Sequence, residues 1–172
     1  NHKDIYLRLA DMNVERGMIG NARENYLKAA RICTQKGMVR ESLEIFRKIA
    51  DLDPENLSVR FKIAEACLKE GLQQEAVAEY LKIAEAHVQK GEMTEAENIF
   101  RQVVGIEPGN QKALLEMGRF NLSGDHPEVA MGYAQKILET QPGSVDALIL
   151  LQETHFRMGQ YDKAEDTVRK LI

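Results

Sequence analysis

The sequence has no tryptophan, only 6% aromatic residues and no long apolar run. A membrane-spanning helix needs about 20 consecutive apolar residues, so we expect no membrane insertion. No secretory signal core is present either. Because the chain begins with Asn1 and ends inside a helical pattern, we expect it to be a fragment of a longer protein, in which case a missing targeting segment is uninformative.

Cysteine is also scarce, and the chain has no marked excess of basic over acidic residues. The two cysteines, Cys33 and Cys67, lie far apart and make no disulfide framework, which favours a reducing compartment and hence the cytoplasm. The formal net charge is -4, and the only part with a positive excess, residues 1–56, carries a single net charge. Without a basic patch, nucleic acid is excluded as the expected partner.

Catalytic motifs are missing as well. The glycines occur singly rather than in a phosphate-binding loop, and no serine lies in a nucleophile motif. Carboxylates stand beside basic residues at helical spacing, as in Lys62–Glu65 and Lys82–Glu85, which is typical of a solvated helix face. The sequence therefore predicts no enzyme and no cofactor.

What the sequence does contain is an internal repeat. A shift of 54 residues superposes residues 57–110 on residues 3–56, and 16 of the 54 positions are then identical. Apolar residues recur at steps of three and four between turns, and no run alternates with the period of a strand. The repeat is therefore helical throughout, and the chain is expected to be all-α.

Glycine and small residues mark each turn at fixed spacing. Single glycines separate helical runs at five turns, and Asp125 takes the same place at another; these residues are Gly17, Gly37, Gly71, Gly91, Asp125 and Gly159. Five residues beyond each turn stands alanine or serine, and four further on stands Tyr26, Phe46, Tyr80 or Phe100 in the first four cases. Small residues let two helices approach closely, and the ring fills the space beside them.

Prolines mark a second kind of boundary. Pro54, Pro108 and Pro142 are each followed two residues later by a residue that caps helix N-termini, namely Asn56, Asn110 and Ser144. Together the boundaries predict about ten antiparallel helices. Their expected ranges are 3–16, 19–36, 39–52, 57–70, 73–90, 93–105, 111–123, 127–140, 145–158 and 161–171.

These residues carry a resemblance to the tetratricopeptide repeat, with its 34-residue period. The steps from Gly37 to Gly71, Gly91 to Asp125 and Asp125 to Gly159 are each 34 residues, whereas two other turns are only 20 residues apart. The resemblance implies a right-handed α-α superhelix, a solenoid forming one domain over residues 1–172. Its expected units are 3–56, 57–110, 111–144 and 145–172, and helices 19–36 and 73–90 serve two repeats each.

The resemblance also implies where a partner would bind. In this family the first helix of each repeat lines a concave groove through fixed positions. When these positions are transferred to this sequence, the candidate partner-binding residues are Phe61, Glu65, Leu68, Lys112, Leu115, Arg119, Leu122, Glu153, Phe156 and Arg157. The alternative is that the apolar members of this set are ordinary packing residues.

Cysteine and histidine at equivalent positions of the repeat are a candidate for metal ligands. One position, four residues before each turn, is occupied by Asn13, Cys33, Cys67, His87, Asn121 and His155. Tight sites need ligands that converge from a short spacing, and the sequence contains no such motif. We therefore predict no metal and interpret these positions as packing residues.

The expected function is protein–protein interaction: a non-catalytic scaffold that binds a partner helix or extended peptide in a concave groove. A structural or self-assembling array is one alternative, with self-association through the C-terminal helix, where Leu171 and Ile172 form an apolar end. A regulatory module of a larger enzyme or signalling protein is another. The sequence does not identify the partner.

Overall fold

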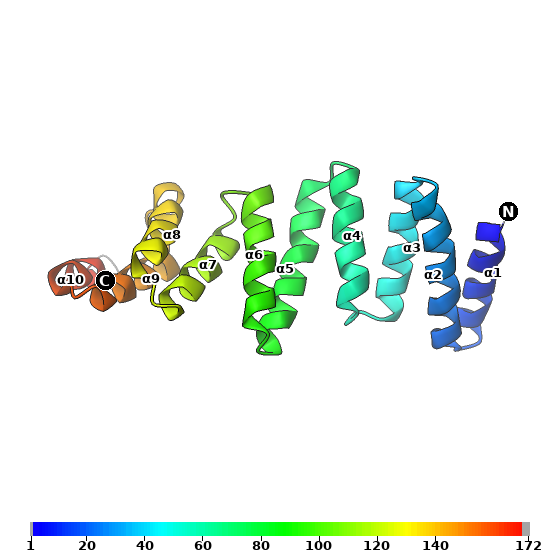
Figure 1. Ribbon diagram of the computed structural model, residues 1–172, viewed down its shortest axis with the longest axis horizontal. Helices are drawn as coiled ribbons and strands as arrows, with labels where there is room; N and C mark the ends of the chain where they lie inside the picture. Colours follow the sequence, from blue (N-terminus) through cyan, green and yellow to red (C-terminus); the bar gives the residue numbers. More distant parts are fainter. Residues whose placement is uncertain (1, 170–172) are drawn as a thin grey trace. The chain divides into compact units, whose positions relative to one another are not determined.

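The computed structural model describes residues 2–169. Within this range the chain forms ten α-helices and no strand, as predicted (Figure 1). The helices are α1 (His2–Glu15), α2 (Ile19–Gln35), α3 (Val39–Leu52), α4 (Leu57–Lys69), α5 (Gln73–Gln89), α6 (Met93–Ile106), α7 (Gln111–Ser123), α8 (Pro127–Thr140), α9 (Val145–Arg157) and α10 (Tyr161–Arg169). The expected contact of Leu171 and Ile172 lies outside the described residues.

The helices belong to two compact units, residues 1–83 and 84–172, with the boundary inside α5. In the first unit α1, α2 and α3 each pack against the next helix along the chain, and in the second unit α6, α7, α8 and α9 do the same. Neighbours joined by a short turn run antiparallel (Figure 1). The single domain and the four repeat boundaries remain predictions.

One backbone arrangement ends a helix at each of the six glycine-type turns. At the end of α2, Gly37 donates its N–H to the Thr34 carbonyl at 3.2 Å, and Met38 donates its N–H to the Cys33 carbonyl at 2.9 Å. The same pair of bonds recurs at Gly17, Gly71, Gly91, Asp125 and Gly159. This pairing is the Schellman motif, which requires a left-handed residue, and each of these residues has a φ between 61° and 75°.

The polar N-caps are confirmed. The side chain of Asn56 accepts a hydrogen bond from the Val59 N–H at 3.2 Å, and that of Asn110 from the Ala113 N–H at 3.0 Å. Ser144 caps α9 in the same way, although its bond is longer, at 3.5 Å. Each cap satisfies one of the backbone donors that the first turn of a helix leaves without an intrahelical partner.

The small positions form the core, as predicted. Ala22, Ala76, Ala96 and Ala130, each five residues beyond a turn, are fully buried. The alanines seven residues before four of the turns are fully buried too; they are Ala10, Ala30, Ala64 and Ala84. The rings expected beside the small residues are buried as well; they are Tyr26, Phe46, Tyr80 and Phe100. Burial of apolar surface at these contacts is the main stabilising contribution that the sequence pattern anticipates.

The surface ion pairs differ from those that the helical spacing suggested. Lys82 pairs with Glu79 at 2.6 Å rather than with Glu85, whose partner is Lys112 on α7. Lys62 and Glu65 form no ion pair with each other. Spacing along one helix does not determine these pairs, because a side chain on a neighbouring helix competes for the same charge.

Gly118 marks a close approach of two helices and gives a stability prediction. A Cβ atom at Gly118 on α7 would lie 2.4 Å from Cδ2 of Leu150, whereas a Cβ at Gly132 on α8 would meet nothing within 4 Å. Leu150 is buried in the core and cannot move away freely. We expect Gly118→Ala to lower the free energy of unfolding by about 1 kcal/mol, because overpacking outweighs the gain in helix propensity.

The matched control is Gly132→Ala, which should raise the free energy of unfolding by about 0.5–1 kcal/mol. Chemical denaturation of both variants measures the difference. Equal stabilisation of the two would contradict the close approach of α7 and α9.

Asp125 gives a second prediction. Its φ of 61° lies in the left-handed region, where the five equivalent turns have glycine. An L-residue with a Cβ is strained there, so we expect Asp125→Gly to raise the free energy of unfolding by about 0.5–1 kcal/mol. Gly159→Ala, at the equivalent turn, should lower it in the same denaturation experiment. Loss of stability in Asp125→Gly would mean that the aspartate side chain contributes more than the strain removes.

Candidate functional site

Among the apolar residues predicted for the site, the most exposed is Phe156 in the last turn of α9. Its side chain is 57% exposed, so it is not a core residue. The ring packs edge-to-face against Tyr161 at the start of α10, with ring centroids 5.4 Å apart. The carbonyl of Phe156 accepts a hydrogen bond from the Gly159 N–H, which fixes the turn that brings the two rings together.

A depression of about 270 Å³ adjoins the Phe156 ring. It brings together four of the predicted site residues and one other; the lining residues are Leu122, Gln152, Glu153, Phe156 and Arg157. Leu122 is only 7% exposed and belongs to a core cluster with Leu150. Leu122 therefore contributes a buried apolar wall, while Phe156 stands in solvent at the edge. We call this surface the Phe156 surface.

Lys112 and Leu115 lie together in a second, smaller depression of about 210 Å³. Leu115 is half-buried and packs against the core of the second unit. Lys112 is ion-paired with Glu85, and Arg119 is ion-paired with Glu116 at 2.7 Å. Intramolecular partners therefore neutralise both of these cations.

Arg119 also lies 3.8 Å from the carboxylate of Asp146. Among residues 2–169, by contrast, Arg157 has no ion-pair partner. Of the cations predicted around the Phe156 surface, Arg157 is thus the one that the described residues leave available to a ligand.

In the first unit the predicted residues Phe61, Glu65 and Leu68 lie on α4. Phe61 is half-buried and packs edge-to-face against Tyr80, with ring centroids 5.6 Å apart. Leu68 is half-buried, and Glu65 is exposed. Only Glu65 of the three lines a groove, a space of about 400 Å³ between α2, α3 and α4.

We call this space the α2–α4 groove. Helix α2 contributes Leu27, Arg31 and Thr34, which the sequence analysis did not select. They occupy the same places relative to Gly37 that Phe61, Glu65 and Leu68 occupy relative to Gly71. The same spacing from the turn therefore predicts these three positions from the sequence. They were not selected because helix 19–36 was interpreted as serving two repeats.

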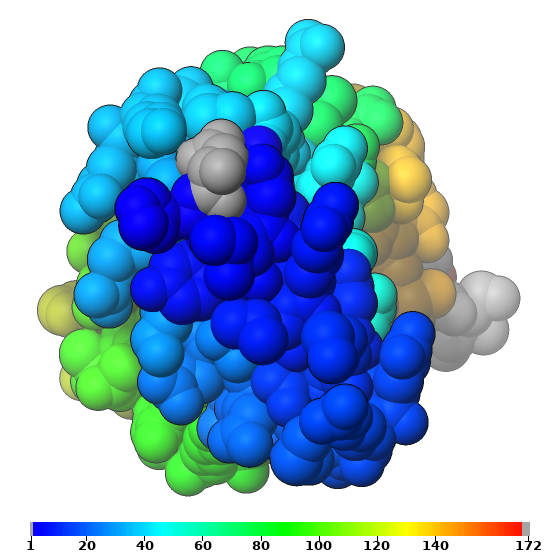
Figure 2. Space-filling view, turned by 90° about the vertical axis from the view of Figure 1, so that its right-hand side faces the viewer, coloured from blue at the N-terminus to red at the C-terminus, as the bar shows by residue number. Residues whose placement is uncertain are grey.

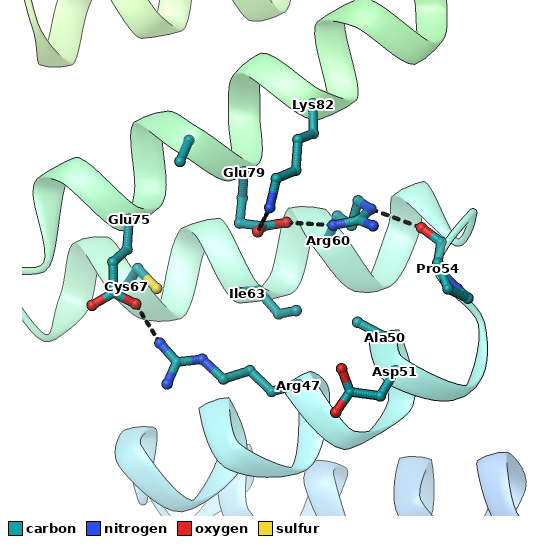
Figure 3. A pocket seen from close by; sticks show the side chains of 11 residues that line it. Arg47, Ala50, Asp51, Pro54, Arg60, Ile63, Cys67, Glu75, Glu79 and Lys82 are labelled. Carbon is teal, nitrogen blue, oxygen red and sulfur yellow. Dashed lines mark hydrogen bonds and ion pairs between the residues drawn. The ribbon is translucent and has the colours of Figure 1, made fainter.

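A larger pocket of about 590 Å³ lies on α3, α4 and α5 (Figure 3). Its cations are all held by groups of the chain itself. Arg47 pairs with Glu75, and Glu79 accepts from Arg60 at 2.9 Å and from Lys82 at 2.6 Å. Burial raises the pKa of Glu79, but hydrogen bonds and charge from Lys82 and Arg60 outweigh it, so the pKa lies below its ordinary value.

Arg60 also donates to the backbone carbonyl of Pro54 at 2.8 Å, as Figure 3 shows. The pocket is lined by equal numbers of cations and carboxylates, since Asp51 accompanies Glu75 and Glu79. We interpret it as a neutralised ion-pair network that joins the three helices rather than as a ligand site.

The positions weighed as metal ligands have a backbone function. Cys33, Cys67 and their equivalents provide the carbonyls that accept the shorter of the two hydrogen bonds at each turn. Both thiols are free and fully buried, and burial raises their pKa. Among residues 2–169, no group of three His, Cys, Asp or Glu side chains is placed to hold a metal ion. No helix in the same range has the length and apolarity to cross a membrane.

Two family models, both described as tetratricopeptide repeat, match the chain at residues 35–87 and 80–110. A comparison with curated protein sequences gives no match. Tetratricopeptide repeats generally mediate protein–protein interaction, and proteins built from them are generally non-catalytic scaffolds.

Solved structures share the fold at low sequence identity. MamA is 17% identical, with 82% of this chain and 91% of that chain covered and a TM-score of 0.52. YrrB, described as a TPR protein with an unusual peptide-binding site, is 14% identical, with 94% and 89% covered and a TM-score of 0.52. A tetratricopeptide repeat protein from Parabacteroides merdae is 21% identical, with 87% and 65% covered and a TM-score of 0.50.

The repeat models and the shared fold agree with the glycine turns, the small core positions and the all-helical structure described above. The chain therefore contains tetratricopeptide repeats, which the family models place within residues 35–110.

Proposed function

We propose that this chain is a non-catalytic protein-interaction module that binds a helix or extended segment of another protein through the Phe156 surface. The observation that carries the proposal is the exposed ring of Phe156 beside a depression with an apolar wall. Large exposed aromatic side chains next to a depression are the usual anchors of protein interfaces.

The ring is also held in place before any partner binds. Its edge-to-face contact with Tyr161 restricts its motion, so that less conformational entropy is lost on binding. Ile149 lies two turns earlier on α9, is exposed, and extends the apolar surface along the helix. An apolar-faced helix or an extended segment could cover Ile149 and Phe156 together, and the available cation of Arg157 favours an acidic residue at its flank.

A self-assembling array is the second candidate, and it is favoured by a different surface. Ile5, Leu9 and Met12 are exposed and follow one another at helical spacing on α1, the helix that faces the viewer in Figure 2. A contiguous apolar helix face of this kind is suited to pairing with another copy of the chain. Sedimentation velocity over a range of concentrations tests this candidate, because Leu9→Lys should dissociate any oligomer that forms through α1.

Phe156→Ala tests the proposed function. We expect the free energy of unfolding to fall by less than about 1 kcal/mol, because the ring is exposed, and the affinity for a partner to fall by about 2 kcal/mol. The probes are peptides of about 15 residues, long enough to form a short helix, selected from a displayed random library against the wild-type chain. Fluorescence anisotropy then measures their affinity for the variant.

Val129→Ala is the matched control, because Val129 is an exposed apolar residue on α8 outside the depression. It should leave affinity unchanged. A loss of about 3–5 kcal/mol of stability with unchanged affinity in Phe156→Ala would make the ring a core residue and would overturn the proposal.

A further inference from the structure

The α2–α4 groove has an apolar floor. Its space of about 400 Å³ is lined by Leu27, Val39, Phe46 and Ala66, from three helices. Phe46 and Ala66 are each only 6% exposed, so the floor is part of the packed core and does not need to rearrange to receive a ligand. A small apolar side chain from outside could therefore be buried there without disturbing the fold.

Three cations surround this floor. Arg31, Lys62 and Lys69 line the groove and are exposed. None of them has an ion-pair partner among residues 2–169. Lys62 instead places its ammonium group over the ring of Phe46, 5.5 Å from the centroid. That contact keeps one positive charge directly above the apolar floor.

The charge of the groove is unusual for this chain. Its lining contains a single carboxylate, Glu65, against three cations, whereas the chain as a whole has a net charge of -4. In the pocket of Figure 3, by contrast, Arg47, Arg60 and Lys82 are all ion-paired within the chain. Both are depressions between helices of the first unit, but only the groove keeps uncompensated positive charge.

We propose that the α2–α4 groove binds an acidic segment of another protein, one in which carboxylates flank a single apolar side chain. The apolar side chain would lie on Phe46 and Ala66, and the carboxylates would pair with Arg31 on one side and Lys69 on the other. This inference rests on the proposed function, since it assigns a second binding surface and its partner chemistry to the same interaction module.

The observations favour an acidic protein segment over a nucleic acid. A phosphate backbone would gain nothing from the apolar floor, whereas a peptide can place an apolar side chain on it. Side-chain carboxylates combined with an apolar residue satisfy both the cations and the floor. Complementary charge would speed encounter, and burial of the apolar side chain would slow dissociation.

The test uses peptides selected from a displayed random library against the full chain, with counter-selection against the Lys69→Glu variant. We expect the recovered sequences to be rich in Asp and Glu around one apolar residue. Their affinity for Lys69→Glu should be at least about tenfold weaker than for the wild type, because a cation that attracts the carboxylates of the peptide is replaced by a carboxylate that repels them. Affinity for the wild type should also fall as salt is raised.

Arg8→Glu is the matched control, since Arg8 is an exposed cation of the same unit that does not line the groove. It should change affinity less than about twofold. Replacing the apolar residue of a selected peptide by alanine should weaken binding by about tenfold, if that side chain is buried on Phe46. A folded Lys69→Glu variant, checked by its circular dichroism and melting temperature, is required for each comparison.

Three outcomes would overturn the inference. They are recovery of peptides without an acidic excess, equal binding to Lys69→Glu, and tighter Lys69-dependent binding of a single-stranded RNA oligonucleotide than of any selected peptide. The Phe156→Ala variant separates this proposal from the proposed function. If peptides selected on the wild-type chain without counter-selection lose affinity for Phe156→Ala but none loses affinity for Lys69→Glu, the proposal for the Phe156 surface stands and the proposal for the groove fails.

Discussion

The pair of backbone hydrogen bonds that ends six of the helices is the constraint on which the other features depend. Each pair needs one residue in the left-handed region, and the chain provides glycine at five of the six places. Because the turn has the same geometry each time, the small residue that follows it and the ring beyond meet the neighbouring helix at the same place. The repeat in the sequence is thus a repeat of one turn and of the packing that the turn permits.

Ion pairing then decides which depressions remain available to a ligand. The two depressions of the first unit both contain buried apolar residues, Ile63 and Cys67 in one and Phe46 and Ala66 in the other, so an apolar lining does not distinguish them. In the pocket on α3, α4 and α5, carboxylates of α5 reach the cations of α3 and α4. In the α2–α4 groove neither Arg31 nor Lys69 forms an ion pair with any of residues 2–169. The difference lies in which charged residues fall on adjacent helices, and it is independent of the fold itself.

Much of the fold could be predicted because its signals are local. A glycine after a helical run, an asparagine after a proline and an alanine at fixed spacing each act within one or two turns, and the helix ends at Gly37 and Asn110 follow directly. The close approach at Gly118 was also readable, since the equivalent positions carry alanine. The site could be predicted only in part. Glu153, Phe156 and Arg157 line one depression in the structure. The pattern did not reveal the ion-pair partners of Lys112 and Arg119, which are Glu85 on another helix and Glu116 on the same helix.

The two buried thiols allow the local unfolding of individual helices to be followed. Cys33 lies on α2 and Cys67 on α4, and each is fully buried with its pKa raised by burial. A thiol in this state does not react with a disulfide reagent until its helix separates from its neighbours. In a repeat protein, where each unit is stabilised mainly by adjacent ones, separate helices can open at separate rates. The rates at which a disulfide reagent labels the two cysteines therefore report the local opening of α2 and of α4, on either side of α3. No introduced probe is needed for this measurement.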